Sequence, residues 1–154
     1  MDKRELRLEY FCYQNSYPVG YENLCKKAIE ASSRAYCVYS EFAVGAALEL
    51  ENGEVITGNN QENAAYPSGL CAERTALFYA GATYPESPVK ALAIAACYKG
   101  IPREEFVPPC GACRQVMAEV IHRYGKDFDV IMIGHKETVL IKASALLPFS
   151  FELK

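Results

Sequence analysis

The chain has 154 residues, a formal net charge of −3, and 23% charged residues. This length fits one domain with a substantial core. A weakly acidic chain without a basic stripe excludes an electrostatic surface for nucleic acid. No apolar run is long enough to cross a bilayer, and the first residues lack the apolar stretch of a signal peptide. We therefore expect a cytoplasmic protein whose scattered cysteines stay reduced.

The first half of the chain reads as strand, helix and hairpin. Alternating apolar residues over 5–13 predict an N-terminal strand. Apolar residues at helical spacing predict a first helix over 20–36. The apolar stretches 43–50 and 55–58 flank Asn52-Gly53, a strong hairpin signal.

The second half alternates helices with buried strands. Residues 71–82 and 111–124 predict helices, each ending near a glycine. The continuous apolar run 89–97 predicts a buried strand, and two shorter strands are expected at 128–133 and 139–141. This order indicates one layered α/β domain over residues 1–154 with a mixed sheet.

Three cysteines provide the strongest chemical signal. Cys71 lies at one predicted helix start, and Cys110 and Cys113 lie at the other. Three thiolates can hold one Zn²⁺ and leave the fourth tetrahedral position to water, which is the ligand count of a catalytic site. Because Glu73 follows the first cysteine by two residues, it can act as a general acid and base there.

Other interpretations of these residues are more ordinary. A lone C-x-x-C motif can be redox-active or half of a structural zinc site. A structural site would need a fourth ligand, and His122 and His135 are the only histidines. Taken alone, Glu73 would be a carboxylate in a first helical turn. Its position beside three cysteines favours the catalytic interpretation.

Three thiolates overcompensate the charge of Zn²⁺, so the sequence should also supply a cation. Arg74 and Arg114 each directly follow one of the motifs. Either guanidinium could donate to a ligand sulfur, as groups behind metal ligands commonly do. Otherwise both are ordinary solvated helix residues.

Together these motifs resemble the small homotetrameric cytidine deaminases over about residues 21–151. The resemblance implies a three-layer α/β/α cytidine deaminase-like domain, an enzyme of pyrimidine salvage, and a homotetramer. The segments that carry it are Tyr39-Ser40-Glu41-Phe42-Ala43-Val44-Gly45, Asn60-Gln61-Glu62-Asn63-Ala64, Tyr66-Pro67, Cys71-Ala72-Glu73-Arg74, Pro109-Cys110-Gly111-Ala112-Cys113-Arg114 and Leu146-Leu147-Pro148.

The resemblance also implies a role for each motif residue at the reaction centre. Cys71, Cys110 and Cys113 would bind one zinc ion per chain. Glu73 would take a proton from a zinc-bound water, deliver it to N3 of the pyrimidine, and later help ammonia leave. The expected reaction is hydrolytic deamination of cytidine and 2′-deoxycytidine.

Substrate contacts carry over in the same way. Phe42 would pack on the pyrimidine, while Asn60 and Glu62 would bind the ribose hydroxyls. The residues expected near the base, or near a neighbouring subunit's site, are Ala72, Ala64, Tyr66 and Phe151.

The chain departs from the family at four places. Pro108 and Asn59 stand where serine and cysteine are common, and the segment 98–107 contains a few additional residues. Pro108 keeps its carbonyl, because proline lacks only the N–H. Residues 1–20 match nothing in the family, so they form an N-terminal extension of open role.

Three other functions remain as alternatives. A related deaminase acting on another cytosine-bearing compound, such as blasticidin, would lose the ribose-binding pair. A nucleic-acid editing deaminase would need positive charge along a phosphate path. A non-catalytic zinc module would have no use for Glu73. We expect a nucleoside substrate, with no nucleic acid and no membrane as partner.

Overall fold

The computed structural model describes residues 1–153, which form one mixed sheet and three α-helices. The helices are α1 (Glu22–Ser32), α2 (Ala72–Thr83) and α3 (Gly111–Tyr124). Short 3₁₀ turns lie at Tyr66–Ser68 and Ala143–Leu146. The strands are β1 (Tyr10–Gln14), β2 (Phe42–Leu50), β3 (Val55–Asn59), β4 (Val89–Tyr98), β5 (Ile101–Pro102), β6 (Asp129–Ile133) and β7 (Glu137–Lys142).

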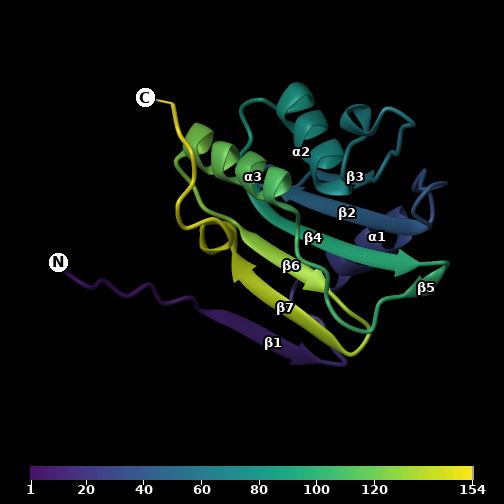
Figure 1. Ribbon diagram of the computed structural model, residues 1–154, viewed down its shortest axis with the longest axis horizontal. Helices are drawn as coiled ribbons and strands as arrows, with labels where there is room; N and C mark the ends of the chain where they lie inside the picture. Colours follow the sequence, from purple (N-terminus) through teal and green to yellow (C-terminus); the bar gives the residue numbers. More distant parts are fainter. Residues whose placement is uncertain (154) are drawn as a thin grey trace.

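The strands join in the order β1-β7-β6-β4-β2-β3, with β5 paired to β4 outside this path. Only β4 and β6 are parallel, and the remaining pairs are antiparallel. As Figure 1 shows, α2 and α3 lie on one face of the sheet and α1 lies on the other. The predicted three-layer α/β/α architecture with a mixed sheet is therefore confirmed.

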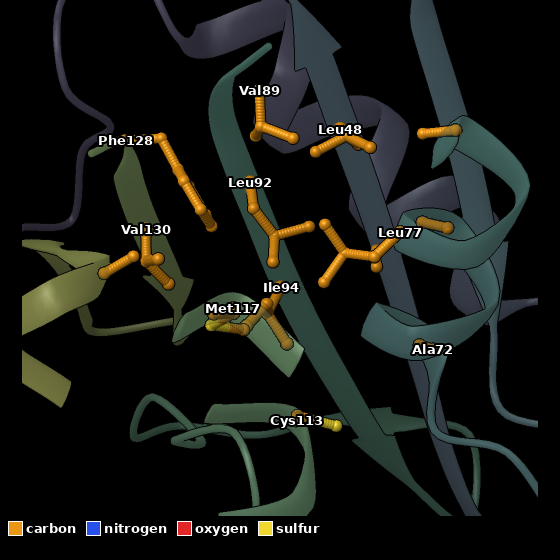
Figure 2. Packing of buried hydrophobic residues seen from close by; sticks show 14 of the residues in the cluster. Leu48, Ala72, Leu77, Val89, Leu92, Ile94, Cys113, Met117, Phe128 and Val130 are labelled. Atoms are coloured by element: carbon orange, nitrogen blue, oxygen red, sulfur yellow. The ribbon is translucent and has the colours of Figure 1, made fainter. Parts of the chain in front are cut away.

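Because side chains alternate between the two faces of each strand, the sheet has a separate hydrophobic core on each face. On β4, Leu92 and Ile94 face α2 and α3, whereas Ala91, Ala93 and Ala95 face α1. The α2/α3 side is filled by large side chains, including Leu77 from α2 (Figure 2). Successive strand residues point to opposite faces, so one apolar run serves both helical layers.

On the α1 face, β2 and β4 carry small residues, which lets the helix approach these strands closely. A Cβ atom on Gly45 would lie 2.0 Å from the carbonyl oxygen of Ala28 and 2.4 Å from the amide nitrogen of Ser32. Such contacts are far shorter than any real Cβ tolerates. Gly45 is thus required by the close packing of α1 on β2.

Several predicted boundaries need adjustment. The first helix was expected over 20–36 but ends at Ser32, where the hydroxyls of Ser32 and Ser33 donate to the carbonyls of Ile29 and Glu30. Hydroxyl bonds of this kind compete with the helical ladder. The N-terminal strand expected over 5–13 is β1, Tyr10–Gln14.

Two elements add to the sheet at positions that the sequence left open. β1 belongs to the N-terminal extension and pairs with β7, matching Tyr10 with Ile141 and Gln14 with Glu137. The segment 98–107 begins as a tight turn into β5. Over residues 1–153, no helix is long and apolar enough to span a membrane.

Candidate active site

The site lies at the N-termini of α2 and α3, beside the interior strands β2 and β4. Cys71 and Cys110 each occupy the position before the helix, with extended backbone at ψ 156° and ψ 166°. Cys113 follows in the first turn of α3. Because Cys71 and Cys110 have extended backbone before their helices, both segments can direct a sulfur atom to one point. Residues two apart within a regular helix would lie on different faces, so Cys71 and Glu73 can share a site only because Cys71 precedes the helix. Helix N-termini also favour thiolates over thiols.

The three sulfurs fit a zinc ion. The Sγ atoms of Cys71 and Cys110 are 3.8 Å apart, and those of Cys110 and Cys113 are 3.5 Å apart. All three lie within 4.8 Å of one another. A tetrahedral Zn²⁺ with Zn–S bonds of about 2.3 Å requires sulfurs about 3.8 Å apart, so the donor set matches.

Neither histidine joins this cluster. Among residues 1–153, the group of potential metal ligands contains only the three cysteines. The Nδ1 atom of His122 lies 3.8 Å from a carboxylate oxygen of Glu152, and His135 follows β6. The residues offer three protein ligands, which leaves a position open for a reacting group.

Arg74 lies behind the sulfurs. Its guanidinium donates to Sγ of Cys71 at 3.5 Å, and its buried Nε has no hydrogen-bond partner among the described residues. Contacts with the Cys113 thiol and with Arg74 lower the pKa of Cys71, while the contact with Cys71 raises the pKa of Cys113. The Arg74 guanidinium therefore places a positive charge beside the three sulfurs, at Cys71.

Arg114 behaves differently from the expectation. Its side chain donates to the carbonyl oxygens of Pro109 at 2.9 Å and Leu146 at 3.1 Å, not to a sulfur. The guanidinium therefore joins the chain just before Cys110 to the C-terminal segment. Its effect on the site is to hold this backbone in place.

Glu73 is the one buried carboxylate of residues 1–153, with 4% of its surface exposed. It sits in the first turn of α2, beside Cys71 and Cys113. Burial raises the pKa of Glu73 above its ordinary value. A carboxyl group with a raised pKa is a stronger base than usual and holds a proton more readily, which suits general acid/base catalysis.

A cleft of about 440 Å³ opens above this carboxylate. It is lined by Glu73, by two of the cysteines, and by three residues that the sequence assigned to substrate: Phe42, Asn60 and Glu62. The remaining lining residues are Ser40, Val44, Ile94, Val107 and Pro108. The structure thus brings the catalytic and sugar-binding candidates together around one cavity.

The two sugar-binding candidates are held by hydrogen bonds. The amide of Asn60 accepts from the Val44 N–H at 2.7 Å and donates to the Phe42 carbonyl at 2.9 Å. Glu62 accepts from the Tyr39 N–H, the Ser40 N–H and the Ser40 hydroxyl. Each side chain still has hydrogen-bonding capacity for a ligand.

These bonds also set the charge of Glu62. The hydroxyl of Ser40 and the backbone N–H of Tyr39 hold the pKa of Glu62 below its ordinary value. Glu62 is therefore an anion in the cleft across the whole neutral range. The sequence did not predict Ser40 as the partner of Glu62, although Ser40 lies in the segment 39–45, two residues before Phe42.

Four expected substrate residues, three exposed and one buried, lie outside the cleft lining of this single chain. Ala64, Tyr66 and Phe151 are exposed, the last two at 77% and 68%. Tyr66 lies 6.3 Å from the ring of Tyr39, and Gln115 holds the backbone of Phe151. Ala72 is fully buried at the first position of α2, next to Glu73.

A family model for the cytidine and deoxycytidylate deaminase zinc-binding region matches residues 19–124. The chain belongs to this family. A cytidine deaminase of Halalkalibacterium halodurans is 46% identical over 130 residues, covering 83% of this chain and 91% of the relative. A probable cytidine deaminase of Dictyostelium discoideum is 37% identical over 131 residues, covering 82% of each chain.

Solved structures agree with the family assignment. The crystal structure of cytidine deaminase from Burkholderia pseudomallei superposes with a TM-score of 0.73 at 36% identity, covering 86% of this chain and all of that one. Cytidine deaminase from Mycobacterium tuberculosis gives 0.69 at 32% identity, covering 88% and 100%. The predicted cytidine deaminase-like fold is confirmed.

The contact between Arg74 and Cys71 makes a testable prediction about metal binding. Arg74→Gln removes the cation behind the thiolates, so we expect zinc affinity or activity to fall roughly 10–100-fold, as is usual for such partners. Zinc content measured against a competing chelator, with activity in parallel, checks this. Arg123→Gln is the matched control, because Arg123 bonds the Pro85 carbonyl on the surface. Equal metal affinity and activity in both variants would exclude the role of Arg74.

Proposed function

We propose that this protein hydrolyses cytidine and 2′-deoxycytidine to uridine and 2′-deoxyuridine, releasing ammonia. One observation carries the proposal: a single buried carboxylate, Glu73, lies beside three cysteine sulfurs spaced for zinc, at the base of an open cleft. A structural zinc site would be closed by a fourth protein ligand. An open site beside a proton-transfer group instead fits hydrolysis.

The three cysteines would hold one zinc ion per chain, which when bound supplies a Lewis acid that makes water nucleophilic at neutral pH. The chain's own contribution is proton transfer. Glu73 has a raised pKa because it is buried, so it can accept a proton from water and return it to N3 of the pyrimidine. The carboxylate can then take the second proton of that water from the hydroxyl group now on C4 and pass it to the departing amine, which leaves as ammonia. The exclusion of solvent around Glu73 strengthens its electrostatic interactions.

The walls of the cleft suit a nucleoside. Phe42 offers an aromatic face to a flat base. Asn60 and Glu62, fixed by their backbone contacts, can receive the hydroxyl groups of a ribose. A buried carboxylate and a sugar-binding edge on one cavity favour cytidine over a cytosine-bearing compound without ribose, such as blasticidin.

Charge favours a nucleoside over a nucleotide. The cleft lining, taken within residues 1–153, contains Glu62 and Glu73 but no lysine, arginine or histidine. A phosphate group in this cavity would face like charge with no cation to offset it. This argues for cytidine and 2′-deoxycytidine as substrates over their monophosphates.

We also propose a homotetramer that acts in pyrimidine salvage in the cytoplasm. Tyr66 and Phe151 are aromatic, exposed and outside the cleft of their own chain, which suits contacts with a neighbouring subunit. Closed point-group symmetry is usual for homo-oligomers. Light scattering should give about four times the 17.1 kDa chain mass. A fully active monomer at assay concentration would contradict the tetramer.

The role of Glu73 is tested by replacing its carboxyl group. Glu73→Ala should keep zinc and fold but lose turnover by at least the ~10²–10⁴-fold typical of general acid/base catalysis. The measurement is kcat for cytidine, with zinc content and thermal unfolding determined on the same sample. Near-normal turnover with zinc retained would exclude the assigned role.

The sugar contacts are tested by comparing cytidine with free cytosine. Binding energy from the non-reacting ribose can position the base in the transition state, so cytosine should show a much lower kcat/KM. Glu62→Ala should lower kcat/KM for cytidine while leaving cytosine almost unchanged. Glu104→Ala, at an exposed surface ion pair with Lys136, is the control. If the native protein treats cytidine and cytosine within a few-fold, the ribose assignment is wrong.

A further inference from the structure

Glu41 has an unusual backbone conformation directly beside the cleft. Its φ of 55° lies in the left-handed region, which only two other non-glycine residues among 1–153 adopt, Asn15 and Lys99. This region is unfavourable for L-residues other than asparagine and aspartate. Such a conformation persists only where the surroundings hold it, and it is common near functional sites.

Hydrogen bonds on both sides hold Glu41. Its N–H donates to the carbonyl of Cys37 at 2.9 Å, and its own carbonyl accepts from the Lys99 N–H at 2.9 Å. Lys99 and Gly100 form the two-residue turn between β4 and β5, with φ of 50° and 76°. Two consecutive left-handed residues are the geometry of a tight hairpin. The turn therefore presents the Lys99 N–H in a fixed position.

The ion pair between these residues adds little. The Nζ atom of Lys99 lies 3.6 Å from a carboxylate oxygen of Glu41, and both side chains are more than half exposed. Exposed ion pairs of this kind contribute little to stability. The constraint on Glu41 thus lies in its backbone, not in its charge.

The reversal of the chain at Glu41 sets two cleft residues relative to each other. The hydroxyl of Ser40 donates to Glu62 and accepts from the Phe42 N–H at 3.0 Å. The hydroxyl oxygen of Ser40 therefore links Glu62, the candidate ribose contact, to the backbone of Phe42, the candidate base contact. In this turn the left-handed backbone of Glu41 lies between the two bonded groups, so a change of its conformation moves the Phe42 N–H relative to the Ser40 hydroxyl.

We propose that Glu41 is a positioning residue: its left-handed backbone, held by the β4–β5 turn, sets Ser40, Phe42 and Glu62 for a nucleoside before the nucleoside arrives. Glu41 itself does not line the cleft. The choice of ligand rests on the proposed function. The arrangement of the turn does not, because it rests on hydrogen bonds within the chain.

The experiment compares three residues at position 41 that differ in the free energy needed to adopt the left-handed conformation. Glycine adopts this conformation freely, alanine less well, and β-branched valine worst. We expect KM for cytidine to stay within about threefold in Glu41→Gly, to rise in Glu41→Ala, and to rise roughly tenfold in Glu41→Val, with kcat changed less. If Glu41→Val does not fold, the glycine and alanine variants alone give the same comparison.

Asn15→Val is the matched control. Asn15 has φ 50° but lies after β1, bonded to the Lys136 carbonyl and away from the cleft. It should lose stability without a change in KM. If all residue-41 variants share one KM, or if KM rises equally in Asn15→Val, the positioning role is wrong.

A second readout needs no substrate. Hydrogen exchange at the amides of Tyr39, Ser40 and Phe42 should quicken in the order glycine, alanine, valine at residue 41, because their bonds to Glu62 and Ser40 depend on the turn. Unchanged exchange would overturn the inference whatever the enzyme's substrate proves to be. If the native protein fails to deaminate cytidine while the three variants show this order of exchange, only the proposed function is overturned.

Discussion

The rest of the site depends on two helix N-termini that converge on three sulfur atoms. α2 and α3 lie on the same face of the sheet (Figure 1) and begin at Cys71 and Cys110. The positive ends of both helices favour thiolates, and the sulfur spacing matches the tetrahedral zinc geometry. Once the sulfurs are placed, Glu73 in the first turn of α2 has to lie beside them, buried and with a raised pKa.

The layered fold fixes the position of α2 relative to α3. Large side chains such as Leu77 and Leu92 fill the space between α2, α3 and the sheet, and Cys113 lies at the end of the same core (Figure 2). The opposite face uses Gly45 and small alanines, so α1 packs with almost no space to its neighbours. A close-packed sheet resists distortion, which keeps the catalytic geometry fixed.

The cleft separates the two tasks of a deaminase between its walls. The helix side holds Glu73, proposed for proton transfer, and the three cysteines that can hold a metal. The β2 side holds the three residues proposed to bind substrate, Phe42, Asn60 and Glu62, which share backbone and hydroxyl contacts. Glu62 gives the cavity a negative charge, and this charge is one reason for proposing a neutral ligand.

The sequence by itself determined the local features: two short motifs supply the candidate zinc ligands and Glu73, and most strands and helices follow from apolar periodicity. Tertiary structure decided the rest. Arg114 binds two carbonyls, Ser40 bridges Glu62 and Phe42, and the N-terminal strand joins β7. These contacts join residues far apart in the chain or depend on one backbone angle. Periodicity and spacing report only near neighbours, so long-range contacts appear only once the chain has folded.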